Sequence, residues 1–188
     1  MKKFDLKEIL IPTVSLFLIC AIVTLLLAVT NSVTAPKIAE LQIETENKTK
    51  VAVLSDANNF SDAKKVAFNN VDYTYYEGYD ADKNIVGYVF TTLAKGYGGD
   101  IITMVGIKAD GTVAGMDFLS ISETAGLGMN ADADEFKNQF VGKSGEIGVN
   151  KTTSSDTEIQ ALTGATITSK AVTEAVNIAL ELFEEVNG

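Results

Sequence analysis

Residues 162–169 read LTGATITS and lead directly into the last part of the chain, where apolar residues recur at helical spacing. The recurring positions are Ala171, Val172, Ala175, Val176, Ala179, Leu180 and Phe183. This spacing predicts an amphipathic helix that begins just after the threonines, with Ser169 as its N-cap. A glycine and several hydroxyl groups therefore lie immediately before the first helical turn.

The start of this helix is a predicted anion site. Backbone N–H groups without partners and the positive end of the helix dipole favour an anion there. Gly164 lets the backbone come close to the group that carries the anion, and the Thr166 hydroxyl would lie at or beside it. The simpler alternative is that the hydroxyl side chains serve only as caps and turn formers, namely those of Thr163, Thr166, Thr168 and Ser169.

Residues 163–166, TGAT, and the following ITSKAV resemble the flavinylation motif of an FMN-binding domain. This domain is shared by the G subunit of the Rnf complex and the C subunit of the sodium-pumping NADH:quinone oxidoreductase. In that family the last threonine of the motif holds FMN through a phosphoester bond, so the resemblance implies covalent FMN on Thr166. The family motif commonly has an acidic residue six positions earlier, where this chain has Gln160. Glutamine keeps the size and hydrogen-bonding reach but loses the charge, so we expect at worst weaker recognition by the flavin transferase and not a missing site.

An uncharged stretch, ILIPTVSLFLICAIVTLLLAV, occupies residues 9–29 and matches the roughly 20 residues that a helix needs to cross a bilayer. It predicts a transmembrane helix in the cell membrane. A cleaved signal peptide is the alternative, but its apolar core is typically only about 7–15 residues long. Lys2, Lys3 and Lys7 precede the span, and the positive-inside rule then places residues 1–8 in the cytoplasm and the rest of the chain on the outer face.

The composition excludes several classes of active site. The chain has 188 residues, a formal net charge of −10, no histidine and one cysteine, Cys20. Histidine-dependent nucleophiles, histidine metal sites and cysteine-ligated iron–sulfur clusters are therefore excluded, and the negative charge disfavours binding to nucleic acid. Carboxylates alone could serve a glycosidase, but no spacing marks a pair. A chain so poor in catalytic groups is what we expect where a bound cofactor carries the chemistry.

The domain organisation follows from the residues after the span. Pro36 is placed to begin a helix that continues to about Thr49, so residues 30–50 are predicted to form a stalk. Residues 51–188 are then a single extracytoplasmic FMN-binding domain. Within it, Asp132 and Glu135 have capping-box spacing at the start of a short helix over residues 132–140. Residues 144–157 are polar and are predicted to be a loop.

Two β-hairpins are predicted in the middle of the chain. The first joins β-rich runs at residues 73–79 and 85–92, and the second joins residues 101–108 and 113–120 around Asp110-Gly111. Tyrosines of the first hairpin could stack on a flavin, but a role in a half-buried strand is the simpler interpretation. The predicted fold class is α+β: one N-terminal transmembrane helix followed by one soluble domain with an antiparallel sheet and packed helices.

Two glycine-bearing loops lie beside these strands, KGYGGD at residues 95–100 and ETAGLGM at residues 123–129. They resemble the Gly-Tyr-Gly-Gly and Glu-Thr-Pro-Gly-Leu-Gly segments that help to shape the flavin pocket of the family, with Ala125 in place of the proline. The resemblance implies that FMN, attached to Thr166, is bound by Gly98, Gly99, Glu123, Thr124, Gly126, Leu127, Gly128, Thr163, Gly164 and Ala165.

The resemblance also implies a function and partners. The protein would be a tethered electron carrier in an Rnf-type ferredoxin:NAD+ oxidoreductase complex coupled to ion transport, and not a catalyst on its own. Other membrane subunits of the complex and a flavin transferase would be its partners. Two alternatives stay open: a flavin subunit of a quinone-reducing or other extracytoplasmic electron-transfer chain, and an assembly module without flavin.

Overall fold

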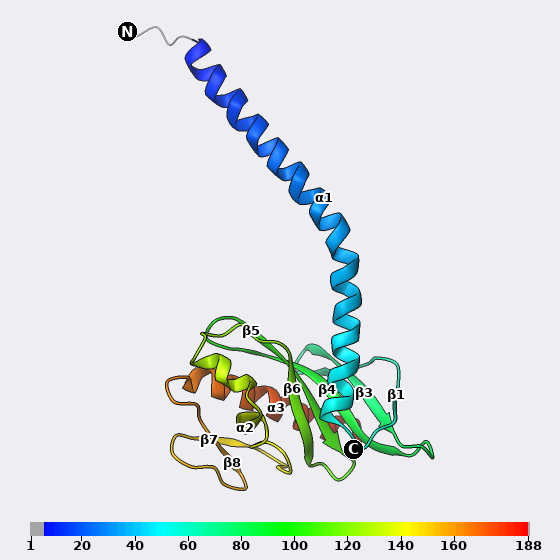
Figure 1. The fold of residues 1–188 in the computed structure, drawn as a ribbon. Helices are drawn as coiled ribbons and strands as arrows, with labels where there is room; N and C mark the ends of the chain where they lie inside the picture. The colour runs from blue at the N-terminus through cyan, green and yellow to red at the C-terminus, as the bar shows by residue number, and fades with distance from the viewer. Residues whose placement is uncertain (1–5, 188) are drawn as a thin grey trace. The chain divides into compact units, whose positions relative to one another are not determined.

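The computed structural model of the protein describes residues 6–187 and begins with one long helix, α1 (Leu6–Val53). The prediction that a helix begins at Pro36 is wrong, because α1 is one long helix (Figure 1) and both Pro12 and Pro36 lie inside it. A proline removes one bond of the helical ladder, and here the ladder continues on both sides of it. The apolar part of α1 has a mean hydropathy of 2.7 and is not buried inside the described structure. By length and composition α1 could cross a membrane, a criterion that an N-terminal signal sequence also meets.

The chain divides into two compact units, residues 1–44 and residues 45–188. The second unit contains a six-stranded antiparallel sheet of mixed α+β architecture, which confirms the predicted fold class. Its strand order is β1-β3-β4-β5-β6, and β2 also pairs with β3. The strands are β1 (Asn59–Phe60), β2 (Lys64–Phe68), β3 (Val71–Tyr79), β4 (Ile85–Lys95), β5 (Asp100–Lys108) and β6 (Val113–Ser120).

Both predicted hairpins are present, β3 with β4 and β5 with β6. The turn between β5 and β6 has Gly111 at a φ of +85°, as the Asp-Gly pair predicts. The tyrosines of β3 have structural partners: Tyr75 stacks on Phe90 with ring centroids 5.7 Å apart, and the Tyr76 hydroxyl donates to Glu46 at 2.5 Å. These contacts support a packing role for both side chains.

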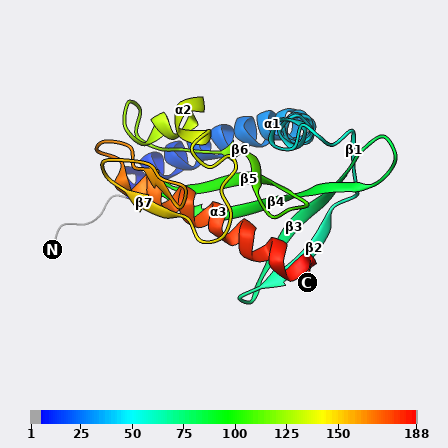
Figure 2. The ribbon, with the colours of Figure 1, turned by 90° about the horizontal axis from the view of Figure 1, so that it is seen from below.

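One face of the sheet is covered by α3 (Thr166–Asn187), which packs against β4 and β5 (Figure 2). All seven apolar positions predicted for this helix are buried, together with Leu182. The core cluster that contains these residues also contains the sheet residues Phe90, Ile101, Val105 and Ile107, each with no exposed surface. Burial of this apolar stripe fixes α3 on the sheet and so places its first turn beside the loop that follows β4.

The opposite face of the sheet holds the last turn of α1 and the residue after it. Val53 and Leu54 are buried against a row of glycines on neighbouring strands. A Cβ at Gly106 would collide with the Val53 carbonyl oxygen, and one at Gly78 would lie 2.6 Å from a Leu54 methyl group. The glycines therefore create the groove into which Leu54 packs.

Four short elements connect the sheet to α3: the 3₁₀ helix η1 (Gly128–Asp132), α2 (Asp134–Lys137), and the parallel strands β7 (Gly148–Asn150) and β8 (Glu158–Gln160). The capping-box prediction is wrong, because Ala133 precedes α2 and makes no side-chain cap. The predicted loop over residues 144–157 instead contains β7, whose partner β8 lies outside that segment.

Candidate functional site

A cavity of about 540 Å³ lies at the start of α3, and we call it the α3 cavity. Its volume falls within the roughly 300–1,000 Å³ typical of small-molecule sites. Three segments that are distant in sequence form its wall, the loop after β4, the loop after β6 and the first turn of α3. The lining residues are Tyr97, Glu123, Thr124, Leu127, Gly128, Gly164, Ala165, Thr166, Ile167 and Thr168.

The helix start inside this cavity has no side-chain cap from its preceding residue. The Ser169 N–H donates to the Ala165 carbonyl at 3.0 Å, so Ala165 occupies the capping position and its methyl group cannot accept a hydrogen bond. The backbone N–H groups of the first three helical residues therefore have no intrahelical acceptor. Gly164 has a φ of +76°, which turns the chain into the helix. This arrangement can bind an anionic group.

Ser169 is not the N-cap that the sequence predicts, because α3 begins three residues earlier, at Thr166. The Ser169 side chain is fully buried and makes two hydrogen bonds instead. Its hydroxyl donates to the Ala165 carbonyl at 3.0 Å and accepts from the Leu162 N–H at 2.9 Å. These bonds fasten the turn at residues 162–165 to the helix and so fix the position of Thr166.

Thr166 differs from the hydroxyl side chains that follow it. Thr168 and Ser169 are buried and hydrogen-bonded. Thr166 is half-buried on the cavity wall, and its hydroxyl has no hydrogen-bond partner among residues 6–187. A cap would use this hydroxyl within the helix start, so the geometry favours a ligand role for Thr166.

The structure brings seven of the eleven predicted site residues to the cavity wall: Glu123, Thr124, Leu127, Gly128, Gly164, Ala165 and Thr166. Gly98, Gly99 and Gly126 do not line the cavity, although the Gly98 N–H donates to Glu123, which does. Thr163 lines a neighbouring cavity of about 360 Å³ with Gln139 and Gln160.

Sequence reasoning missed three lining residues, Tyr97, Ile167 and Thr168. Tyr97 is 72% exposed, Ile167 55% and Leu127 44%, so three large, mainly apolar side chains of the cavity lining are open to solvent. Tyr97 and Ile167 carry a signal in the sequence, because each is a large, mainly apolar residue among glycines or hydroxyl residues, where no core position is expected. An exposed apolar rim of this kind suits a flat aromatic ligand.

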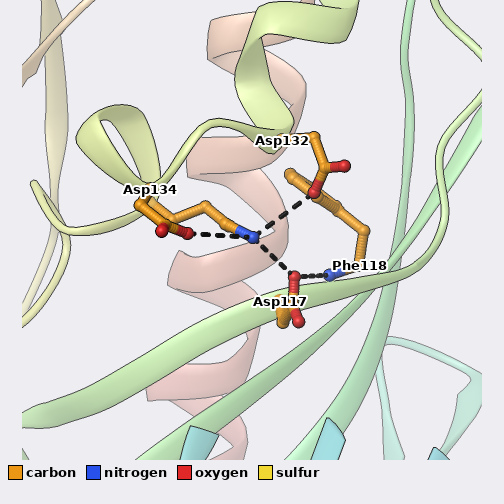
Figure 3. A network of polar contacts seen from close by, with 5 residues as sticks. Asp117, Phe118, Asp132 and Asp134 are labelled. Carbon is orange, nitrogen blue, oxygen red and sulfur yellow. Dashed lines mark hydrogen bonds and ion pairs between the residues drawn. The ribbon is translucent and has the colours of Figure 1, made fainter. Parts of the chain in front are cut away.

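An ion-pair network holds the elements that follow the second cavity loop. The Lys137 ammonium lies 2.9 Å from Asp117, 3.3 Å from Asp132 and 3.7 Å from Asp134 (Figure 3). Asp117 lies on β6, Asp132 belongs to η1, and Asp134 and Lys137 belong to α2. Burial lowers the pKa of the Lys137 ammonium, but hydrogen bonds and charges of Asp117 and Asp132 outweigh burial, so the net pKa lies above 10.5. The network therefore anchors η1 to the sheet edge.

Replacing Lys137 by methionine should lower the free energy of unfolding by about 1–3 kcal/mol, because three carboxylates lose their shared cation. Since the folded pKa is raised, the contribution of Lys137 is complete below pH 10.5 and disappears as the pH rises through the folded pKa. Urea unfolding at pH 7 measures the loss. Lys65→Met, at an exposed position of β2, is the control, and an equal effect of both variants would contradict a structural role for the network.

The comparisons with known proteins agree with this geometry. Residues 96–181 match the FMN-binding domain family, and residues 1–49 match the RnfG N-terminal region. The first match contains the whole α3 cavity, from Tyr97 to Thr168. The match, together with the fold, marks this part of the chain as an FMN-binding domain.

Two relatives identify the family more closely. The G subunit of the proton-translocating ferredoxin:NAD(+) oxidoreductase complex of Clostridium ljungdahlii is 37% identical over 188 residues, which cover 100% of this chain and 98% of the relative. The G subunit of the Na(+)-translocating ferredoxin:NAD(+) oxidoreductase complex of Acetobacterium woodii is 36% identical, covering 98% and 96%. The chain belongs to the family of G subunits of ion-translocating oxidoreductase complexes, which confirms the resemblance found in the sequence.

A solved structure shares the fold. NqrC of Shewanella oneidensis aligns with a TM-score of 0.52 and 19% identity, over 68% of this chain and 67% of that chain. At this identity the similarity establishes the architecture alone.

Proposed function

We propose that the protein is the flavin-carrying G subunit of a membrane-bound ferredoxin:NAD+ oxidoreductase complex that transports ions. FMN is joined to the Thr166 hydroxyl oxygen through a phosphoester, with loss of one water relative to free FMN. The observation that carries the proposal is the Thr166 hydroxyl, which has no hydrogen-bond partner among residues 6–187 and lies at a helix start without a side-chain cap on the wall of the α3 cavity. The names of the relatives from C. ljungdahlii and A. woodii support the complex.

The residues of the cavity fit the parts of FMN. The backbone N–H groups at the start of α3 would face the phosphate and stabilise its charge. Tyr97, Leu127 and Ile167 present apolar surface at the cavity mouth, suited to the isoalloxazine ring. When bound, FMN supplies the capacity to accept and donate electrons. The chain itself holds and shields the cofactor.

The membrane topology is part of the same proposal. Residues 9–29 of α1 cross the membrane, residues 1–8 stay in the cytoplasm, and the stalk at residues 30–50 leads to the flavin domain of residues 51–188 on the outer face. The covalent bond keeps the cofactor on a domain that cannot exchange flavin with a cytoplasmic pool. The other membrane subunits of the complex supply and receive the electrons.

Expression of the full chain with and without its flavin transferase tests the proposal. With the transferase, flavin fluorescence should remain on the polypeptide after denaturation and electrophoresis, because an ester survives unfolding and a non-covalent complex does not. Without the transferase the band should stay dark. A dark band with a transferase that is active on another substrate would refute covalent attachment and favour an assembly module without flavin.

A further inference from the structure

Glu123 connects all three walls of the α3 cavity. One carboxylate oxygen accepts the backbone N–H of Gly98 at 3.0 Å, and the other accepts the hydroxyl of Thr168 at 2.8 Å. Gly98 belongs to the loop after β4, and Thr168 lies in the first turn of α3. The two partners are 25 and 45 residues away in the sequence. The side chain of Glu123 therefore joins two segments that are far from it in the sequence.

The surrounding glycines leave room for this carboxylate. A Cβ at Gly96 would collide with one of its oxygens, and a Cβ at Gly128 would lie 2.7 Å from the other. The same Cβ at Gly128 would also lie 2.7 Å from the Thr168 hydroxyl oxygen. Alanine at either position would displace the Glu123 carboxylate. Gly96 and Gly128 are therefore needed to leave space for this carboxylate.

Both partners of the carboxylate act as donors, as an ionised carboxylate requires. Glu123 lines the α3 cavity, and no lysine is found among the described residues that line this cavity. A negative charge at this position opposes the addition of electrons to a bound redox group.

We infer that Glu123 is a positioning residue that fastens the loop at residues 96–99 to the start of α3, and that its carboxylate lowers the reduction potential of the flavin. The part of the inference that concerns the reduction potential rests on the proposed function. The part that concerns the loop does not need the cofactor. Among the described residues, the hydrogen bonds of the Glu123 carboxylate go to Gly98 and Thr168 and not to the Thr166 hydroxyl, so we expect FMN attachment without a chemical role of Glu123.

Three variants separate the charge from the hydrogen bonds. Glu123→Gln removes the charge and keeps the shape: its amide oxygen accepts from Gly98, and its NH₂ group can donate to the Thr168 oxygen after rotation of the hydroxyl. Glu123→Ala removes both functions. Thr168→Val removes one hydrogen bond and keeps the charge. Glu184→Gln, at an exposed position near the end of α3, is the matched control for charge.

The first measurement is hydrogen exchange of the peptide that contains residues 96–99, in the full chain made without flavin transferase. Glu123→Ala should accelerate exchange about tenfold, and Thr168→Val should accelerate it less, because the loop loses its anchors. Glu123→Gln and Glu184→Gln should exchange like the parent. Unchanged exchange in Glu123→Ala would overturn the fastening role, whether or not the parent can be loaded with flavin.

The second measurement is the midpoint potential of the flavin in the loaded full chain. Glu123→Gln should shift the potential to a more positive value, whereas Thr168→Val and Glu184→Gln should stay closer to the parent. A parent potential retained in flavin-loaded Glu123→Gln would overturn the electrostatic role. A parent without any flavin would instead refute the proposed function, which the exchange measurement does not depend on.

Discussion

Replacing Thr166 by alanine should reduce covalent flavin to the background of the assay, since the chain then lacks the oxygen that forms the phosphoester. Thr166→Val should have the same result, because valine keeps the branched shape of threonine and lacks the hydroxyl. The Thr166 hydroxyl has no hydrogen-bond partner among the described residues, so neither variant should unfold the domain. In-gel flavin fluorescence after co-expression with the transferase measures the effect.

A matched control shows that the loss is specific to this position. Thr157 is an exposed threonine that precedes β8 and lies outside the α3 cavity. Thr157→Ala should keep the full parent fluorescence, and circular dichroism should show both Thr166 variants folded. Persistent covalent flavin in Thr166→Val would place the ester on another residue.

Replacing Leu54 by alanine should give the largest loss of stability among the predicted variants, about 2–5 kcal/mol. Leu54 has no exposed surface and fills the groove that the sheet glycines create. Because glycines have no side chains to fill the space, the groove cannot close after truncation. At roughly 2–4 °C per kcal/mol, the midpoint of thermal unfolding should fall by several degrees or more.

Thermal unfolding of the full chain in detergent, followed by near-ultraviolet circular dichroism of the tyrosines, measures this loss. Leu93→Ala is the control, since Leu93 is 49% exposed on β4 and its truncation should change stability by no more than about 0.5 kcal/mol. Equal midpoints for parent and Leu54→Ala would contradict the role of the groove in holding the residue after α1.

Local patterns were sufficient for the central elements of the fold. The Asp110-Gly111 turn predicts one hairpin, and the apolar repeat from Ala171 to Phe183 predicts the buried face of α3. Asn69-Asn70, with φ values of +49° and +62°, forms the turn that joins β2 to β3, and such an asparagine pair is a further local hairpin signal. Each of these signals lies within a few residues of the structure it specifies.

Features that depend on distant partners could not be predicted in this way. β7 is a strand because it pairs in parallel with β8, and a parallel pair leaves no turn signature between its strands. Ser169 resembles an N-cap in sequence, but its hydroxyl is used within the buried turn at residues 162–165. The resemblance supplied the candidate residues of the site, whereas the contact between Glu123 and Thr168 required the folded chain.

Mass analysis of peptides from the denatured, transferase-treated protein tests covalent flavin on Thr166 most directly. The account predicts one modified peptide that contains residues 162–169, heavier by FMN less one water, with fragmentation that assigns the addition to Thr166. The same addition on Thr163 or Thr168, or only unmodified peptide from a preparation in which the transferase is active, would contradict it.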